Sequence, residues 1–311
     1  MKHCSIIMVW LYLAFMLAGC SQKGLNLSTD KWAPINQPAE KKTIKQREPC
    51  SHYIMEKQAL FGDLHVHTAF SMDANSRGTR TTPDDAYAFA SGKRLDPKNS
   101  GHIQSAQLQQ IDRPLDFAAV TDHAEWLAET SLCTSRNSPS YESKGCKIYR
   151  GEENSLLATL LDLNGFRARL AGVVNLGGRA SDVCGRNDSI CRKELKNQWA
   201  VIQQSAEEWY DRTSDCSFTT FHAWEYSRSP YSSKVHRNIL LRNELSPELP
   251  ISSLETTSEI DLRHQLMKLC NDTETGCEAI AIPHNPNLSN GQMFKIEYGD
   301  LPISQQRLEA S

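Results

Sequence analysis

Residues 61–74 read FGDLHVHTAFSMDA and place two histidines one residue apart, with an aspartate on either side. In a strand, residues i and i+2 point to the same face, so His65 and His67 can present both imidazoles to one ion. Asp63 falls on that face and is expected to orient a ring, and Asp73 in the following loop is expected to reach the ion as a ligand. Alone, the pair fits either a surface strand that happens to carry histidines or a metal site.

Three further segments repeat this pattern, in which a short apolar run ends at a histidine or a carboxylate. The runs in LDFAAVTDHAE, CSFTTFHAWEYS and CEAIAIPHNPN lead to His123, Glu225 and His284, and His236 precedes the run NILL. Such runs predict buried strands. Polar residues at the carboxyl ends of parallel strands are where α/β folds build their sites. The sequence therefore predicts one metal centre, with these ligands: His65, His67, Asp73, His123, Glu225, His236 and His284.

The chemistry of this set favours transition metals. Histidine combined with carboxylate suits Zn, Mn or Fe, and a bridging glutamate suits a pair of ions. We therefore expect Glu225 to bridge, with Glu225, His284 and Asp73 as the candidate catalytic residues. His222 lies an odd number of residues from Glu225 and is expected to face away from the centre.

Helical patterns separate the predicted strands. Thr82 and Pro83 begin one helix as N-cap and first-turn residue, followed by acids that suit the helix dipole. Apolar spacing near three and four predicts further helices over residues 153–163, 192–212 and 258–270. Strands that alternate with helices predict a parallel sheet and an α/β fold.

The N-terminal stretch MKHCSIIMVWLYLAFMLAGC predicts export. Residues 1–19 read as a signal peptide, and the residues before Cys20 resemble the lipobox of bacterial lipoproteins, in which the cysteine is lipidated; the alternative is an ordinary secretory signal. Residues 20–49 read as a tether and residues 50–311 as one metal-binding domain. We expect a lipid anchor in the membrane and a place in the bacterial cell envelope, at the outer membrane.

Eight cysteines remain after the signal and the lipid site, and an even set in an exported protein predicts disulfides. Three pairs bracket short polar loops, in the segments 133–146, 184–191 and 270–277. Cys50 and Cys216 are left over and can pair, although other connectivities are open. A cysteine zinc site is disfavoured because no CxxC spacing occurs.

The composition of the chain argues against nucleic acid as a partner and restricts the function little otherwise. The chain has 311 residues and a formal net charge of −3, with 39% hydrophobic and 23% charged residues. These values predict a mainly soluble globule and provide no electrostatic reason to expect nucleic acid as a partner. The expected partner is a small-molecule substrate. Arg77, Arg80 and Lys93 could meet a substrate phosphate, although surface bases are commoner.

The motifs together resemble a known superfamily. HVHT with a following Asp, TDH, a strand-end Glu and later histidines resemble the PHP (polymerase and histidinol phosphatase) superfamily. FGDLHVHT, TTPDDAYAFA, RPLDFAAVTDHAEWL and PHNPNLSNGQMF are more similar to the uncharacterised PHP-like domain of unknown function numbered 3604. The resemblance implies a distorted (β/α) barrel that holds two or three ions, ligated by His65, His67, His123 and Glu225. It also implies phosphoester hydrolysis by a metal-bridged hydroxide.

The sequence departs from the superfamily at its end. PHP barrels close with an Asp-x-His motif, and the only one here is Asp63-Leu64-His65, already used in the first motif. We therefore expect a barrel that is incomplete at its C-terminal end. The alternatives to a phosphoesterase are a catalytically impaired, surface-anchored binding lipoprotein and an amidohydrolase-type enzyme that cleaves C–N bonds.

Overall fold

The computed structural model describes residues 44–96, 108–175, 178–230, 233–272 and 274–294. The expected signal peptide, Cys20 and most of the expected tether lie outside these residues. The strands are β1 (Gly62–Val66), β2 (Phe117–Val120), β3 (Val174–Asn175), β4 (Gly178–Arg179), β5 (Thr219–Thr220), β6 (Ala223–Arg228), β7 (Val235–Leu241) and β8 (Ala279–His284). The helices are α2 (Met72–Ser76), α3 (Pro83–Ala90), α4 (Leu127–Thr134), α5 (Lys144–Arg150), α6 (Leu156–Leu160), α7 (Gly165–Leu170), α8 (Ser181–Cys184), α9 (Ser189–Trp209) and α10 (Glu259–Leu266).

Strands β1, β2 and β5 form a parallel sheet in that order, as the α/β prediction requires. Gly62 pairs with Phe117 at the start of β1. A Cβ atom at Gly62 would lie 2.3 Å from a ring carbon of Phe117, so this position in the motif needs glycine. The parallel register brings the carboxyl ends of β1 and β2 to the same edge, where the first histidines lie.

Strands β6, β7 and β8 are antiparallel, so the prediction of parallel strands throughout is wrong. Only residues 229–234 connect β6 to β7. A parallel neighbour needs a crossover of a dozen or more residues, so this connection has to reverse the chain. Glu225 consequently lies in the middle of β6 and not at the end of a strand.

The two sheets are joined by a bridge at the predicted centre. His123, just past β2, forms a parallel bridge with Glu225 of β6. The backbone N–H of Ala124 donates to the Glu225 carbonyl over 2.9 Å. The Asn238 side chain of β7 donates to the carbonyl of Leu64 in β1 over 2.7 Å. The strands therefore curl around the histidines, although β1 and β8 do not pair and the described strands form no closed barrel.

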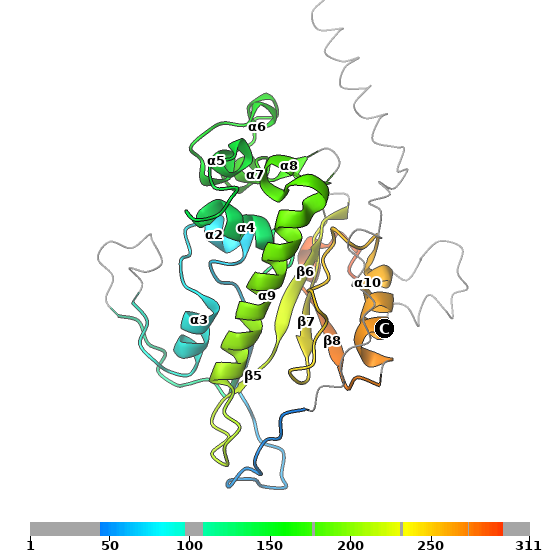
Figure 1. Ribbon diagram of the computed structural model, residues 1–311. Coiled ribbons are helices and arrows are strands. Elements are labelled where there is room, and N and C mark those ends of the chain that lie inside the picture. Colours follow the sequence, from blue (N-terminus) through cyan, green and yellow to red (C-terminus); the bar gives the residue numbers. More distant parts are fainter. Residues whose placement is uncertain (1–43, 97–107, 176–177, 231–232, 273, 295–311) are drawn as a thin grey trace, which may run out of the picture.

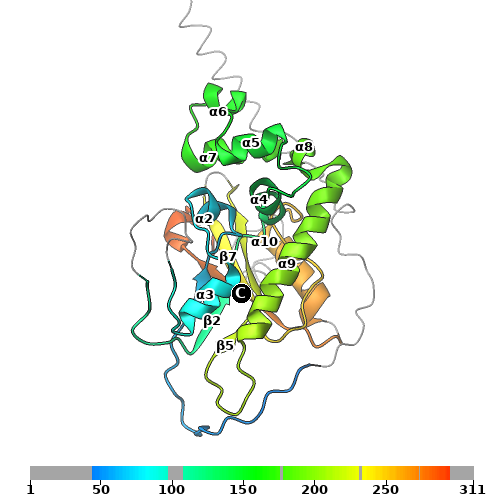
Figure 2. The same cartoon turned by 60° about the vertical axis from the view of Figure 1, so that its left-hand side comes forward.

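Helices cover the sheets and build the core. In Figures 1 and 2, α9 runs along the sheet beside α3 and α4, and α5 to α8 gather at one end of the molecule. Trp199 of α9 packs edge-on against Trp224 of β6, with ring centroids 5.5 Å apart. Each indole N–H donates to a loop carbonyl, of Pro247 and Ile251 respectively, so these large rings are buried without losing a hydrogen bond.

The local predictions are largely confirmed. Thr82 caps α3 and forms a capping box with Asp85. The expected helix over 153–163 shortens to α6, and the one over 258–270 divides into α10 and a π-helical turn over Met267–Asn271. Three disulfides form around short loops as the spacing indicated, in the pairs Cys133–Cys146, Cys184–Cys191 and Cys270–Cys277. The two cysteines left over, Cys50 and Cys216, form the fourth.

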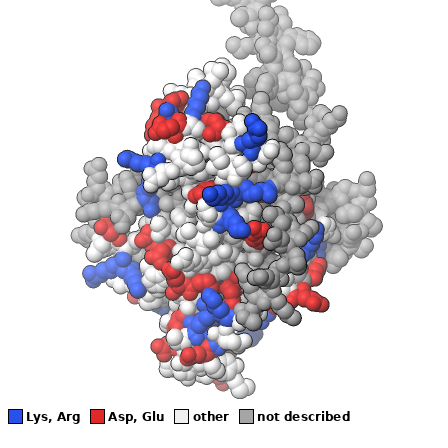
Figure 3. Space-filling view, in the orientation of Figure 1, with Lys and Arg blue, Asp and Glu red and all other residues white. Residues whose placement is uncertain are grey.

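The surface carries mixed charge. Figure 3 shows Lys and Arg side chains interspersed with Asp and Glu over the visible face. Mixed charge of this kind steers charged ligands only weakly toward the visible face. No helix among the described residues combines the length and the apolar character needed to cross a bilayer.

Candidate metal centre

The carboxylate of Glu225 lies at the middle of five histidines. Its side chain is 1% exposed, and each carboxylate oxygen faces several imidazoles. Around Oε2, His67 Nε2 lies at 2.7 Å and His65 Nε2 at 3.1 Å. Around Oε1, His236 Nδ1 lies at 2.7 Å, and nitrogens of His123 and His284 lie at 3.5 Å.

One group of ligands combines two histidines that follow β1 and β2 with Glu225 of β6. His67, His123 and Glu225 each offer a ligand atom, and these atoms lie within 4.8 Å of one another. Asp73 of α2 adjoins them, with Oδ1 at 3.1 Å from His67 Nδ1 and 3.8 Å from His123 Nε2. The short helix α2 thus holds a carboxylate against the strand-end histidines.

A second group shares the same glutamate. His65 of β1, His284 of β8 and Glu225 also place their ligand atoms within 4.8 Å. The rings of His65 and His284 lie 4.1 Å apart. His65 is 40% exposed, so the centre opens to solvent on this side. Five of the seven predicted ligands therefore form two groups that share one carboxylate, and the other two, Asp73 and His236, lie beside them.

The charges of the centre are set by burial and by the carboxylates. Burial would lower the pKa of His67, but hydrogen bonds to Asp73 and Glu225 outweigh it and raise this pKa to about 10. Burial lowers the pKa of His123 to about 4, so that ring is neutral. Burial would raise the pKa of Glu225, but hydrogen bonds from the histidines, His236 first, hold it far below its usual range. Binding of a cation therefore releases the His67 proton, and metal affinity should increase with pH.

The donor set fits metal ions. Both ring nitrogens of His284 are buried, and neither has a well-formed hydrogen bond to another described residue; the contact of Nε2 with Glu225 Oε1 is long, at 3.5 Å, although an imidazole taken out of water normally finds a partner. Imidazole and carboxylate are the ligands that Zn, Mn and Fe accept. A glutamate with histidines beside both of its carboxylate oxygens is suited to binding two ions at once. These side chains can hold a metal ion, and the arrangement leaves its identity open.

The comparison with protein families agrees with the more specific resemblance. A family model described as "Protein of unknown function (DUF3604)" matches residues 54–309. The chain belongs to the DUF3604 family. All seven predicted ligands fall inside the matched range. No curated protein and no solved structure matches the chain.

Three side chains of this DUF3604 chain support the centre without having been predicted. The Ser227 hydroxyl donates to Glu225 Oε1 over 2.9 Å and lies 2.6 Å from His123 Nδ1. Ser71 donates to Asp73 Oδ1 over 2.7 Å. The buried Asp122 accepts the backbone N–H and the hydroxyl of Thr68, which fixes the turn after β1. Ser227 was detectable, because it lies two residues after Glu225 on the same strand face.

The predictions for two neighbouring residues, Asp63 and His222, have different outcomes. Asp63 has no hydrogen bond to a histidine ring of the described residues, and its carboxylate accepts the backbone N–H of His65 over 2.9 Å. His222 faces away from the centre as predicted, and its Nε2 lies 3.2 Å from Glu207.

Substitution of Ser227 by Ala is expected to weaken metal binding by roughly 10–100-fold. Because the hydroxyl donates its own proton to Glu225, it can accept a proton from His123 Nδ1 in the tautomer that leaves Nε2 free to bind metal, and the alanine variant loses this orientation. Titration with Zn²⁺ against a competing chelator measures the change. Ser253→Ala is the matched control, because Ser253 donates to the Ser227 carbonyl and not to a histidine. Equal affinity in the Ser227→Ala variant and the wild type would exclude an orienting role.

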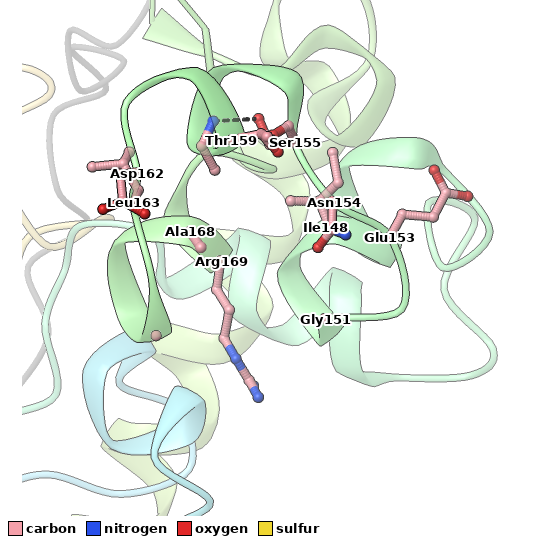
Figure 4. A pocket seen from close by; sticks show the side chains of 12 residues that line it. Ile148, Gly151, Glu153, Asn154, Ser155, Thr159, Asp162, Leu163, Ala168 and Arg169 are labelled. Atoms are coloured by element: carbon pink, nitrogen blue, oxygen red, sulfur yellow. Dashed lines mark hydrogen bonds between the residues drawn. The ribbon is translucent and has the colours of Figure 1, made fainter.

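Two other features of the DUF3604 chain, a cluster of one glutamate with two cysteines and a surface hollow, lack the converging ligands of the metal centre. Glu129, Cys184 and Cys191 lie close enough to hold an ion, but the two cysteines form a disulfide and so present no thiolate. A hollow between α5, α6 and α7 is lined by Glu153, Asp162 and Arg169 among others (Figure 4). Figure 4 shows these charged side chains pointing in different directions, so they do not converge on a ligand.

Proposed function

We propose that this chain is a metal-dependent hydrolase of the PHP superfamily that cleaves phosphoesters. The observation that carries the proposal is the pair of ligand groups that share the Glu225 carboxylate, one with His67 and His123 and the other with His65 and His284. When bound, a pair of ions would lower the pKa of water and neutralise charge that develops on a transferred phosphoryl group.

The protein side chains divide into ligands and a proton-transfer group. Glu225 links the two groups, and Asp73 adds a carboxylate beside His67 and His123. His236 lies outside both groups, with its Nδ1 only 2.7 Å from Glu225 Oε1. If Nδ1–H donates to this carboxylate, the Nε2 atom is left as the free base. His236 would then take a proton at Nε2 from the attacking water and return it to the leaving oxygen.

The cell-envelope location belongs to the same proposal. The four disulfides support folding in an oxidising compartment. Together with the lipobox at Cys20 they support an exported, lipid-anchored protein that meets its substrate outside the cytoplasm.

The test is turnover of generic esters by the purified chain with and without added metal. We expect hydrolysis of 4-nitrophenyl phosphate that requires Zn²⁺, Mn²⁺ or Fe²⁺ and is lost with a chelator. Hydrolysis of amide substrates in place of phosphoesters would favour the amidohydrolase alternative. Bound metal without turnover of either substrate class would favour a binding lipoprotein.

A further inference from the structure

The Arg77 guanidinium lies directly beside the metal centre. Its Nη1 is 3.1 Å from Asp73 Oδ2, while Oδ1 of the same carboxylate faces His67 and His123. A single carboxyl group therefore separates Arg77 from the ligand atoms. The Arg77 side chain is 68% exposed, so it borders the centre from solvent.

Most of the hydrogen-bonding capacity of Arg77 is unused. Its contacts in the described part of the chain are made by Nη1 alone, to the Asp73 carboxylate and carbonyl. Nε and Nη2 have no partner there. A guanidinium presents its donors as a planar fork that matches two oxygens of a phosphate. Arg80 differs in its partners, because its Nη1 donates to the backbone carbonyls of Asn75 and Thr79 and not to a carboxylate of the centre.

We infer that Arg77 binds the substrate phosphoryl group and makes the site selective for phosphomonoesters, an inference that rests on the proposed function. A monoester carries three non-bridging oxygens and a diester carries two. If two ions face the phosphoryl group, they would take two of these oxygens, and the third oxygen of a monoester would remain to accept a hydrogen bond from Arg77. A diester presents an ester substituent at that position and gains little from Arg77.

The competing role for Arg77 is to hold Asp73 in place. That role predicts a loss of bound metal when the guanidinium is removed. The substrate-binding role predicts unchanged metal content and a selective loss of phosphoryl affinity. Metal content and ligand binding therefore separate the two roles without reference to turnover.

The experiment compares the full chain with its Arg77→Gln and Arg77→Lys variants. Arg113→Gln is the matched control, because Arg113 is similarly exposed and pairs with Asp116 over 3.3 Å away from the centre. Calorimetry with methylphosphonate, on metal-loaded and on metal-free protein, and elemental analysis accompany kinetics on 4-nitrophenyl phosphate and its bis-ester. We expect Arg77→Gln to weaken methylphosphonate binding about 10-fold or more and to lower kcat/KM for the monoester by about 10–100-fold. Its effect on the bis-ester should stay under about threefold, and Arg77→Lys should recover only part of the loss.

The results test the role of Arg77 and the proposed phosphoesterase function separately. Loss of metal in Arg77→Gln, equal losses for monoester and diester, or methylphosphonate affinity equal to wild type would each overturn the inference. If the wild type carries metal but hydrolyses neither ester, the proposed function fails. Methylphosphonate binding then still decides whether Arg77 recognises phosphoryl groups.

Discussion

Replacing Glu225 by glutamine is expected to remove bound metal from both ligand groups and to abolish turnover. Glu225 is the residue that the two groups share, so its loss affects both ions, whereas His284→Ala affects one. Glutamine keeps the size of the side chain but removes the anionic charge that five imidazoles surround. The loss should exceed the roughly 10–100-fold that removal of an outer-shell partner costs.

Elemental analysis of the purified variants measures this effect. The expected order of metal content is wild type, then His284→Ala, then Glu225→Gln with almost none. Glu207→Gln is the matched control, because Glu207 also lies beside a histidine, His222, but outside the centre. Wild-type metal content in Glu225→Gln would contradict a shared carboxylate.

Removal of the Cys50–Cys216 disulfide is expected to cost the most stability among the four bridges. This bridge joins residues 166 positions apart, whereas Cys270–Cys277 joins residues 7 apart. In the loop-entropy model the longer bridge stabilises by about 5 kcal/mol and the shorter by about 2.5 kcal/mol.

Urea unfolding of the Cys50→Ser/Cys216→Ser and Cys270→Ser/Cys277→Ser proteins compares the two free energies of unfolding. The first pair should lose more, and its metal content should stay at the wild-type level, because neither cysteine contacts a ligand. Equal losses would mean that the bridges act mainly through native-state contacts and not through the unfolded chain.

The composition of the site was predictable from the sequence because its ligands follow local rules. His65 and His67 share a face through the two-residue period of a strand, and the ends of β1 and β2 meet in a parallel pair. The disulfides around short loops follow from sequence proximity alone. These features depend on neighbours along the chain or on one strand pairing.

The direction of the later strands depended on longer-range information. Apolar runs that end in histidine look alike in parallel and antiparallel sheets, so the runs that form β7 and β8 were predicted in the wrong direction. The antiparallel strand β6 was not distinguished from the parallel strand β5 that precedes it. The short connection over residues 229–234 was the available signal. The contact of Ser227 with His123, 104 residues away in the chain, appears only once the strands are placed in space.

Anomalous diffraction from crystals of the metal-loaded protein tests the two-ion centre most directly. We predict two peaks on either side of the Glu225 carboxylate, one next to His67 and His123 and the other next to His65 and His284. Peaks elsewhere in the molecule, or ions that do not touch Glu225, would contradict the account.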